Sequence, residues 1–508
     1  MFYKSLVVFY ICLKHITLKK LSPLHVLLFV LATFICLAPA VYFIPKDGFD
    51  FYGMHFNFLP KEAFFTPIKQ EKKDISTIVT KVDTLINDVP NDLVKHKNLS
   101  NKSIAAPNGL ELSTESSTSI FLSGSALQNL HRFFEKLASA SENNSKTHIL
   151  HYGDSQIEGD RMTAFIRQRI QSQFGGVGPG LVPAMNVYST NTYKQTYSAN
   201  FQRYTCFGGA KLKNRRYGVM GSAARFTAEM DSARMANETS IKEAWIELEP
   251  GKTAYSRSKK FNVVKMYYNS CYKPCSVKIY QGSKLIHEDS LVKDGRFHSL
   301  DLSFSSTPEK LKYVFNAAVS PTITGFNLES ETGVQVSNIG MRGTNGLIFG
   351  YMDQALLGKM YQELNTDLFL LQFGGNSVPF FKDSSSVRNY VRSLKGQIGT
   401  LKRLRPSAAF ILIGPSDMSH LENGVFVSYP LLAYCTQQLK KMSGENGVGY
   451  YDLYAAMGGN NSMPSWVEQG LAGKDYIHFS VRGASIASQL FYDAFAAEFA
   501  KWYQQKNP

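Results

Sequence analysis

Two stretches of this chain share one rhythm, in which short apolar segments are followed by amphipathic helical segments. This alternation constrains the fold most, because buried strands joined by helices pair as a parallel sheet that is covered on both faces. Strands are predicted at 148–152, 367–373, 408–413 and 449–454, and helices at about 159–174, 387–404 and 484–502. The sequence therefore predicts an α/β fold, with its first strand and helix far from the others along the chain.

The residues between these two parts show a different pattern of apolar and polar side chains. Residues 186–335 contain short alternating or aromatic segments, among them AWIELE, NVVKMYYN and KLKYVFNA, which turn sequences such as DGR and QGS separate. Alternation of this kind between turns is typical of a β-sandwich. We therefore predict that 125–185 and 336–508 form one α/β domain and that 186–335 is an all-β domain inserted into it.

An uncharged apolar run lies near the N-terminus, at 26–44. Its 19 residues are enough to cross a bilayer as a helix. Lysines precede the run and aspartates follow it, which predicts a short cytoplasmic tail and a transmembrane anchor in 1–45, with all later residues outside the cytoplasm. A cleaved signal peptide is the main alternative, because Ala38-Pro39-Ala40 has a cleavage pattern; a buried core helix is a third. The first two place the folded part in the periplasm or outside the cell, anchored to the inner membrane or secreted.

Residues 46–124 show no sustained period, and their later half is polar and rich in Ser, Asn and Thr. This composition predicts a flexible spacer between the membrane and the folded part. The folded part is expected to begin at Ser125, where a capping-box pattern with Gln128 opens an apolar helical face.

The net charge of +15 is concentrated in the predicted insert. Residues 200–312 contain 20 Lys and Arg against 11 Asp and Glu, a difference of +9. Outside the cytoplasm this argues against nucleic acid as a partner and favours an anionic polymer, although a solvated surface without a partner is the alternative. Cys271 and Cys275 could form a small disulfide loop or remain free thiols, and the sequence leaves both open.

The segment GDSQ places Ser155 directly after an apolar strand and before a predicted helix. A serine at such a turn is exposed at the carboxyl edge of a sheet, where the helix N-terminus favours developing negative charge. The same serine could simply cap the helix. A hydrolytic serine also needs a base, and the base needs an orienting partner.

His478 and Asp475 supply a candidate base and partner. They lie in GKDYIHFS, after the last predicted strand and before the final helix. An Asp-x-x-His turn lets the carboxylate reach Nδ1 and hold Nε2 toward a serine, although both residues could also lie on an ordinary surface loop. Asn376 in LQFGGNSVP and Gly343 in NIGMRGTNG could donate hydrogen bonds to an oxyanion, or could be turn residues only.

Together, these four blocks resemble the pattern of the SGNH (GDSL-type) hydrolases, over 125–185 and 336–508. The resemblance implies that Ser155 is the nucleophile, His478 the base and Asp475 the orienting acid. It also implies an oxyanion hole made by the backbone N–H groups of Ser155 and Gly343 and by the Asn376 side chain. No metal or cofactor is expected. The third block departs from the common GxND pattern, because Ser follows Asn376.

A narrower resemblance covers the insert. The opening GDSQIEGDRM, the long β insert and the exit GFNLESETGVQV look like peptidoglycan O-acetylesterases, in which a carbohydrate-binding-like module splits an SGNH domain. This implies a cell-envelope serine esterase that removes O-acetyl groups from peptidoglycan or a related acetylated glycan through an acetyl-serine intermediate. The alternatives are an envelope polysaccharide O-acetyltransferase, a glycan-binding scaffold with a catalytically idle fold, and a lipid or thioester hydrolase.

Overall fold

The computed structural model describes residues 22–37, 49–51, 54–56, 70, 72–80, 119–140 and 145–506. These residues belong to two compact units. The first unit, Met1–Gln70 with Leu421–Val425, includes helix α2 (Pro23–Leu37) and the hairpin of β1 (Phe49–Phe51) and β2 (Met54–Phe56). The second unit, Glu71–His420 with Phe426–Pro508, contains the sheets and the candidate site described below.

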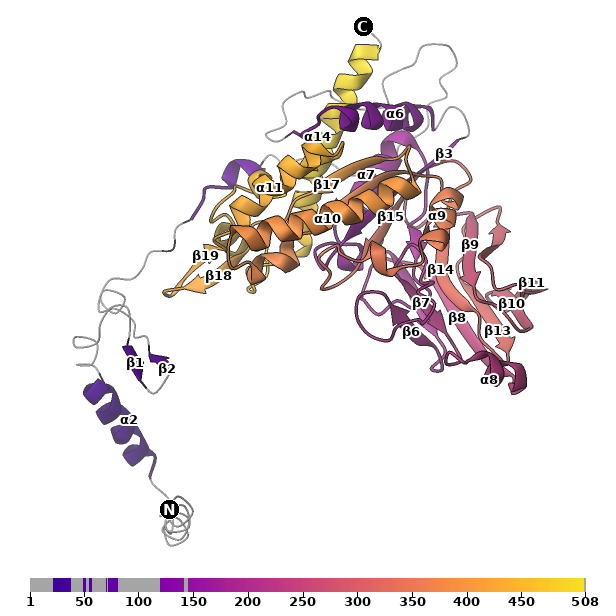
Figure 1. The fold of residues 1–508 in the computed structure, drawn as a ribbon, viewed down its shortest axis with the longest axis horizontal. Helices are drawn as coiled ribbons and strands as arrows, with labels where there is room; N and C mark the ends of the chain where they lie inside the picture. The colour runs from indigo at the N-terminus through magenta and orange to yellow at the C-terminus, as the bar shows by residue number, and fades with distance from the viewer. Residues whose placement is uncertain are drawn as a thin grey trace. The chain divides into compact units, whose positions relative to one another are not determined.

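A five-stranded parallel sheet forms the centre of the second unit (Figure 1). Its order is β15-β3-β16-β17-β20, and every neighbouring pair is parallel. The strands are β3 (Lys146–Gly153), β15 (Gly333–Gly340), β16 (Thr366–Gln372), β17 (Ala409–Ile413) and β20 (Gly449–Tyr451). The predicted α/β fold with a parallel sheet is confirmed. Because β3 comes first in the chain and has neighbours on both sides, the carboxyl end of β3 is where such sheets bind ligands.

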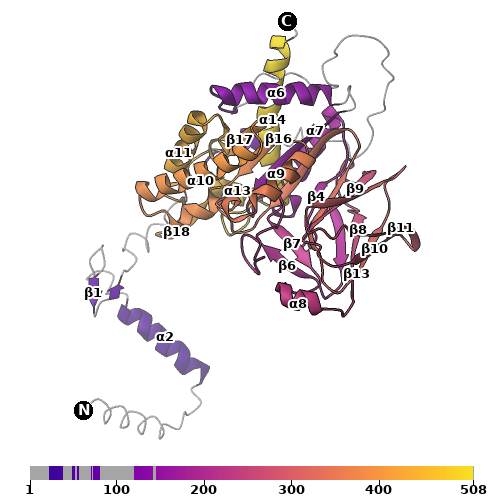
Figure 2. The ribbon, with the colours of Figure 1, turned by 45° about the vertical axis from the view of Figure 1, so that its right-hand side comes forward.

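Helices cover both faces of this sheet (Figures 1 and 2). Successive strand residues face opposite cores: Ile149 and Leu370 join one apolar cluster, whereas Leu150 and Phe369 join the other. The first cluster includes side chains of α6 (Ser125–Ser139), α7 (Thr163–Phe174) and α14 (Val481–Lys506). The second includes side chains of α9 (Gln354–Glu363), α10 (Ser384–Leu404) and α11 (Leu432–Glu445). Burial on both faces explains why these strands read as continuous apolar runs.

Two antiparallel sheets lie between α7 and β15 in the sequence. One has the order β11-β10-β13-β8-β5, and the other β12-β9-β14-β7-β6 with β4 also paired to β14. The strands are β4 (Gly180–Val182), β5 (Tyr193–Tyr197), β6 (Gln202–Thr205), β7 (Ser222–Arg225), β8 (Lys242–Pro250), β9 (Val263–Asn269), β10 (Cys275–Gln281), β11 (Lys284–Ser290), β12 (His298–Ser303), β13 (Leu311–Ala317) and β14 (Thr322–Glu329). Their inward side chains form a separate apolar core, as in a sandwich.

The edges of the insert differ slightly from the predicted range of 186–335. Strand β4 begins at Gly180 and already pairs with β14, and β15 begins at Gly333 within the parallel sheet. One contact between the insert and the α/β domain involves Asp160, whose two carboxylate oxygens accept from the guanidinium of Arg167 on α7, at 2.7 and 3.0 Å. Thr192 of the insert donates to the same carboxylate, at 2.6 Å. The hydrogen bond from Thr192 thus links the insert to this buried pair.

The second unit also contains shorter elements: the 3₁₀ helices η1 (Glu158–Asp160), η2 (Phe349–Tyr351) and η3 (Gly375–Phe380), and the helices α8 (Ser232–Asn237), α12 (Leu453–Ala456) and α13 (Met463–Glu468). The hairpin strands β18 (Ser419–Glu422) and β19 (Val425–Ser428) are divided between the two units. Cys271 and Cys275 are buried free thiols. Burial raises the pKa of Cys271 to about 11 and that of Cys275 to about 12, which makes both thiols poorly reactive.

The N-terminal expectations are tested only in part. Helix α2 has 15 residues, and none of the helices among the described residues is long and apolar enough to cross a membrane. Residues 38–44 of the predicted span lie outside the described residues, as does most of the predicted spacer. Part of that spacer is not a free linker, because Ile75 is fully buried in the core of the α/β domain and Lys73 is hydrogen-bonded to Ser465. Ile75 thus attaches to the α/β domain a stretch whose polar composition had predicted a free linker.

Candidate active site

Ser155 lies in a turn just beyond the carboxyl end of β3. The helix predicted to start at about 159 begins later, at Thr163, after the 3₁₀ helix η1. Gly159 and Asp160 both have a φ of +67°, a left-handed conformation that an α-helix does not tolerate. Ser155 is therefore separated from α7 by a tight turn and is not the N-terminal residue of that helix.

The structure brings together the three residues that the sequence pattern singled out. The Ser155 Oγ atom lies 2.8 Å from Nε2 of His478, and Nδ1 of His478 lies 2.8 Å from Oδ2 of Asp475. The second carboxylate oxygen of Asp475 accepts hydrogen bonds from the backbone N–H groups of Ile477 and His478, at 3.0 and 3.1 Å. A serine, an imidazole and a carboxylate in this order can transfer a proton from the hydroxyl to the imidazole.

The environment of Asp475 favours its charged form. Partial burial acts to raise the pKa of this carboxyl, but hydrogen bonds from the His478 side chain and from the backbone N–H groups of His478 and Ile477 outweigh it and lower the pKa. Asp475 therefore stays ionised at neutral pH. An ionised carboxylate at Nδ1 holds the imidazole with Nε2 directed at Ser155.

Gln156 holds the histidine loop in place. Its side-chain amide donates to the backbone carbonyl of Ile477 at 2.7 Å, and its carbonyl oxygen accepts from the backbone N–H of Phe479 at 3.4 Å. These partners flank His478 on both sides. The amide also donates to Ser416 at 3.2 Å, which follows strand β17. One side chain beside the serine thus fixes the loop that carries the imidazole, a role that the sequence analysis missed.

The residues predicted to form the oxyanion hole come from three adjacent strands. Ser155 follows β3, Gly343 follows β15 and Asn376 follows β16, and all three line one cleft with a volume of about 620 Å³. Gly343 has a φ of +78°, with open space where a side chain would project. The Asn376 amide donates to the carbonyl of Thr344 at 2.9 Å, which orients it. The three residues of the predicted oxyanion hole therefore meet in one cleft, where the Asn376 amide is already hydrogen-bonded to Thr344.

Asp154 is a buried carboxyl beneath the serine. Burial raises its pKa to about 6, although hydrogen bonds from the backbone N–H of Gln156 and from the Asn376 side chain act in the opposite direction, as does the charge of His478. The hydrogen bond from the Gln156 N–H measures 3.0 Å. Asp154 thus touches both the turn that presents Ser155 and the asparagine of the third block, so it can position both.

An arginine also lines the cleft. Arg342, the residue before Gly343, makes two hydrogen bonds of 2.6 Å to the carboxylate of the buried Glu158. Its guanidinium carbon lies 5.3 Å from the centre of the Tyr188 ring, which belongs to the insert. Glu158 lies in the block GDSQIEGD and Arg342 in the block NIGMRGTNG, but nothing in either block indicated that the two residues pair. The cleft wall thus contains a fixed cation that touches the insert.

Comparisons with known proteins identify the fold. No protein-family model matches the sequence, and no curated protein matches it. Among solved structures, a peptidoglycan O-acetylesterase is similar with a TM-score of 0.58 and 19% identity, over 74% of this chain and 97% of that chain. A putative GDSL-like lipase from Parabacteroides merdae has a TM-score of 0.24 and 14% identity, over 32% of this chain and 74% of its own.

A family two carbohydrate esterase from Clostridium thermocellum has a TM-score of 0.21 and 11% identity, over 59% of this chain and 97% of its own. This likeness and that to the GDSL-like lipase are too weak to carry an argument. The fold is thus similar to that of the peptidoglycan O-acetylesterase, and the four sequence blocks lie around one cleft. The expected resemblance to a peptidoglycan O-acetylesterase is confirmed at the level of the fold.

Proposed function

We propose that this protein is a serine esterase of the cell envelope that removes O-acetyl groups from peptidoglycan or a related glycan. The observation that carries the proposal is the pair of 2.8 Å contacts that link Ser155 to His478 and His478 to Asp475 inside an open cleft. The solved structure with the similar fold is described as a peptidoglycan O-acetylesterase, which supports the choice of substrate class.

The proposed reaction has two steps. Ser155 Oγ attacks the acetyl carbonyl while His478 Nε2 takes the hydroxyl proton, and the N–H groups of Ser155, Gly343 and Asn376 stabilise the oxyanion. The protonated imidazole then gives its proton to the departing sugar oxygen, leaving acetyl-serine. In the second step, His478 removes a proton from a water molecule that attacks the acetyl group, and the proton returns to Ser155 as acetate leaves.

The rim of the cleft suits a sugar. Phe380 lines the cleft with 79% of its side chain exposed, at the end of η3. Arg161 adds positive charge to the same cleft, whereas Arg342 is paired with Glu158. An acetylated sugar with acidic groups fits this lining better than a fatty acyl chain does.

Acetate release from purified O-acetylated peptidoglycan tests the function. Other acetylated polysaccharides serve as controls for the sugar, and a small chromogenic acetyl ester reports on the serine itself. Release of free acetate without formation of an acetylated acceptor supports the esterase function. Transfer of the acetyl group to an added glycan would identify an O-acetyltransferase instead, and failure to cleave even the small ester would indicate an idle fold.

We also propose that the N-terminal run at 26–44 anchors the protein, with the catalytic domain outside the cytoplasm. The absence of charge over 26–44 and the lysines before it support this orientation. Protease added to intact spheroplasts should digest the catalytic domain and leave an N-terminal fragment in the membrane. A catalytic domain recovered in the soluble fraction with its N-terminus near residue 41 would favour cleavage of a signal peptide.

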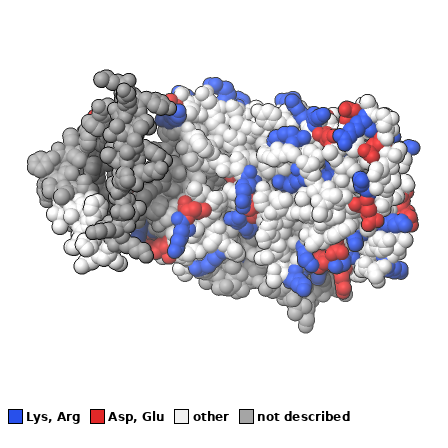
Figure 3. Space-filling model, turned by 90° about the horizontal axis from the view of Figure 1, so that it is seen from below, with Lys and Arg blue, Asp and Glu red and all other residues white. Residues whose placement is uncertain are grey.

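The insert is proposed to bind the anionic cell-wall glycan. On the face shown in Figure 3, Lys and Arg side chains are interspersed with Asp and Glu, so net charge alone does not locate a site. Several insert lysines are already paired with acids: Lys194, Lys265, Lys278 and Lys310. By contrast, the exposed Lys211, Lys213 and Arg215 between β6 and β7 make no ion pair with any described residue. This loop is therefore the strongest candidate contact.

A further inference from the structure

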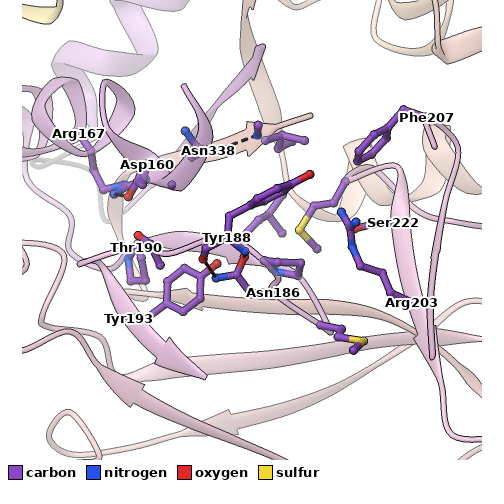
Figure 4. A pocket seen from close by; sticks show the side chains of 18 residues that line it. Asp160, Arg167, Asn186, Tyr188, Thr190, Tyr193, Arg203, Phe207, Ser222 and Asn338 are labelled. Carbon is purple, nitrogen blue, oxygen red and sulfur yellow. Dashed lines mark hydrogen bonds and ion pairs between the residues drawn. The ribbon is translucent and has the colours of Figure 1, made fainter. Parts of the chain in front are cut away.

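A small cavity lies where the insert meets the α/β domain, next to the candidate active site. Its volume is about 60 Å³. Residues Asn338 and Gly340 of β15 and Asp160 of η1 form the wall on the α/β side, and Tyr188, Arg203, Phe207 and Ser222 belong to the insert. In the view of Figure 4, Tyr188 lies between the Asp160–Arg167 pair and Arg203.

The charges around this cavity do not balance. Asp160 is neutralised by Arg167, which donates to both of its carboxylate oxygens, and it also accepts a hydrogen bond from Thr192. The Nε atom of Arg203 is buried without a hydrogen-bond partner among the described residues. A buried donor without a partner destabilises the folded protein unless a ligand binds to it. Arg203 is half-buried, and no Asp or Glu among the described residues forms an ion pair with it.

Aromatic rings hold that cation in position. The Arg203 guanidinium carbon lies 5.7 Å from the ring centre of Tyr188 and 5.5 Å from that of Phe207. The Tyr188 ring also contacts Arg342, at 5.3 Å, and Arg342 lines the cleft with Ser155. Tyr188 lines the cavity and thus connects Arg203 with Arg342, which lines the cleft. A glycan that extends from Ser155 past Arg342 and Tyr188 would reach Arg203.

The size of the cavity restricts the ligand. One water needs roughly 10–15 Å³ of such volume, so the cavity accepts a group of a few atoms and not a sugar ring. A carboxylate has this size, and it matches the planar fork of a guanidinium. The nearby carboxylates of Asp160 and Glu158 are already paired with Arg167 and Arg342.

We propose that Arg203 binds a carboxylate of the glycan substrate in this cavity while an acetyl group of the same glycan lies at Ser155. This rests on the proposed esterase function and deepens it, because the enzyme would select acetylated glycans that carry acids. The carboxylate could belong to a peptide stem or to an acidic sugar. Strands with and without peptide stems distinguish these two sources.

The test compares two substrates that differ only in charge: an O-acetylated acidic glycan and the same glycan with its carboxylates converted to amides. Wild-type protein should prefer the acidic form by at least about tenfold in kcat/KM, and this ratio should fall to about one in Arg203→Gln. Arg203→Lys keeps the charge without the planar fork and should lie between them. Lys284→Gln, an exposed lysine on β11, removes the same charge from the insert and should keep the wild-type ratio.

Binding supplies a readout that does not depend on the reaction. Calorimetric titration of the Ser155→Ala protein with the acidic glycan should give a Kd that rises at least about tenfold when Arg203→Gln is added. The proposal is overturned if Arg203→Gln leaves this Kd unchanged, or if it weakens binding of the amidated glycan equally. If wild-type protein cleaves a small acetyl ester but no acetylated glycan, the proposed function fails, while a Kd that depends on Arg203 still upholds the carboxylate site.

Discussion

The Oγ atom of Ser155 lies 2.8 Å from Nε2 of His478, although 323 residues separate them in the chain. The insert of 186–335 accounts for much of that separation, yet it leaves the contact intact because both residues are fixed within the α/β domain. Ser155 follows the interior strand β3, and Gln156 beside it binds the backbone on both sides of His478. The geometry therefore depends on the sheet and on Gln156 more than on the sequence between the two residues.

Ser155→Ala should lower ester hydrolysis by at least about 10³-fold, because the proposed nucleophile is lost. The melting temperature should stay close to that of the wild type, since Ser155 contributes one partly buried hydroxyl. Hydrolysis of a chromogenic acetyl ester measures the loss. Ser393→Ala, an exposed serine on α10, is the matched control and should keep full activity. Near-normal turnover by folded Ser155→Ala protein would contradict the assignment.

His478→Ala should reduce kcat nearly as much as the serine change does, and Asp475→Ala should reduce it less. The three residues act as a unit, and the orienting acid is often the least sensitive member. Asp475 also binds two backbone N–H groups of its own loop, so Asp475→Asn, which keeps an acceptor there, separates charge from loop structure. His287→Ala in the insert is the control. The assignment fails if another histidine is essential and His478 is not.

Gln156→Leu should lower kcat by about 10–100-fold while KM changes little, because a displaced imidazole slows the reaction without removing substrate contacts. Leucine fills a similar space but cannot bind the backbone at Ile477 and Phe479. Steady-state kinetics on the small ester gives the split between kcat and KM. Gln397→Leu on α10 is the comparable change away from the cleft. An unchanged kcat would show that the loop is held without Gln156.

Asp154→Asn should make stability less dependent on pH between about 4 and 6. Burial raises the pKa of Asp154 from 3.8 to about 6, so the folded protein binds a proton that the unfolded chain has already lost in this window. Wild-type stability therefore falls as pH rises through it, by an amount on the order of 3 kcal/mol for a shift of about two units. Asparagine does not titrate, so the Asp154→Asn variant should not lose stability in this way as the pH rises. Urea unfolding at pH 4 and pH 7 measures the difference, and parallel pH profiles would contradict the prediction.

Changing Lys211, Lys213 and Arg215 together to glutamine should weaken binding to insoluble peptidoglycan, and added salt should weaken wild-type binding in the same way. Arg216 is left in place because its guanidinium donates to the carbonyl of Gly295 at 2.6 Å and supports the fold. Co-sedimentation measures binding, and small-ester turnover measures the catalytic site. Equal losses in both assays would show that this loop shapes the cleft instead of binding the polymer.

Much of the architecture follows from local patterns in the sequence. The apolar strand segments, the amphipathic helices and the alternating insert each report the burial of their own side chains, so periodicity alone predicted the parallel sheet and the inserted sandwich. The four blocks likewise predicted Ser155, Gly343, Asn376, Asp475 and His478 as one group. Parallel strands place their carboxyl ends at one edge, and for that reason blocks far apart in the chain meet in one cleft.

Other features depend on tertiary contacts that have no local signature. The left-handed conformations of Gly159 and Asp160 end the turn that contains Ser155 before α7 begins. Ile75 packs into the core although its sequence surroundings predict a linker. Gln156 at the histidine loop and Arg203 in the cavity are ordinary polar residues in the sequence. They acquire roles because distant backbone atoms and rings pack around them. The sequence by itself thus determined the fold class and the residues of the candidate site. Only the tertiary structure decided how those residues are held and which charges remain unpaired, because both depend on distances between segments that periodicity does not encode.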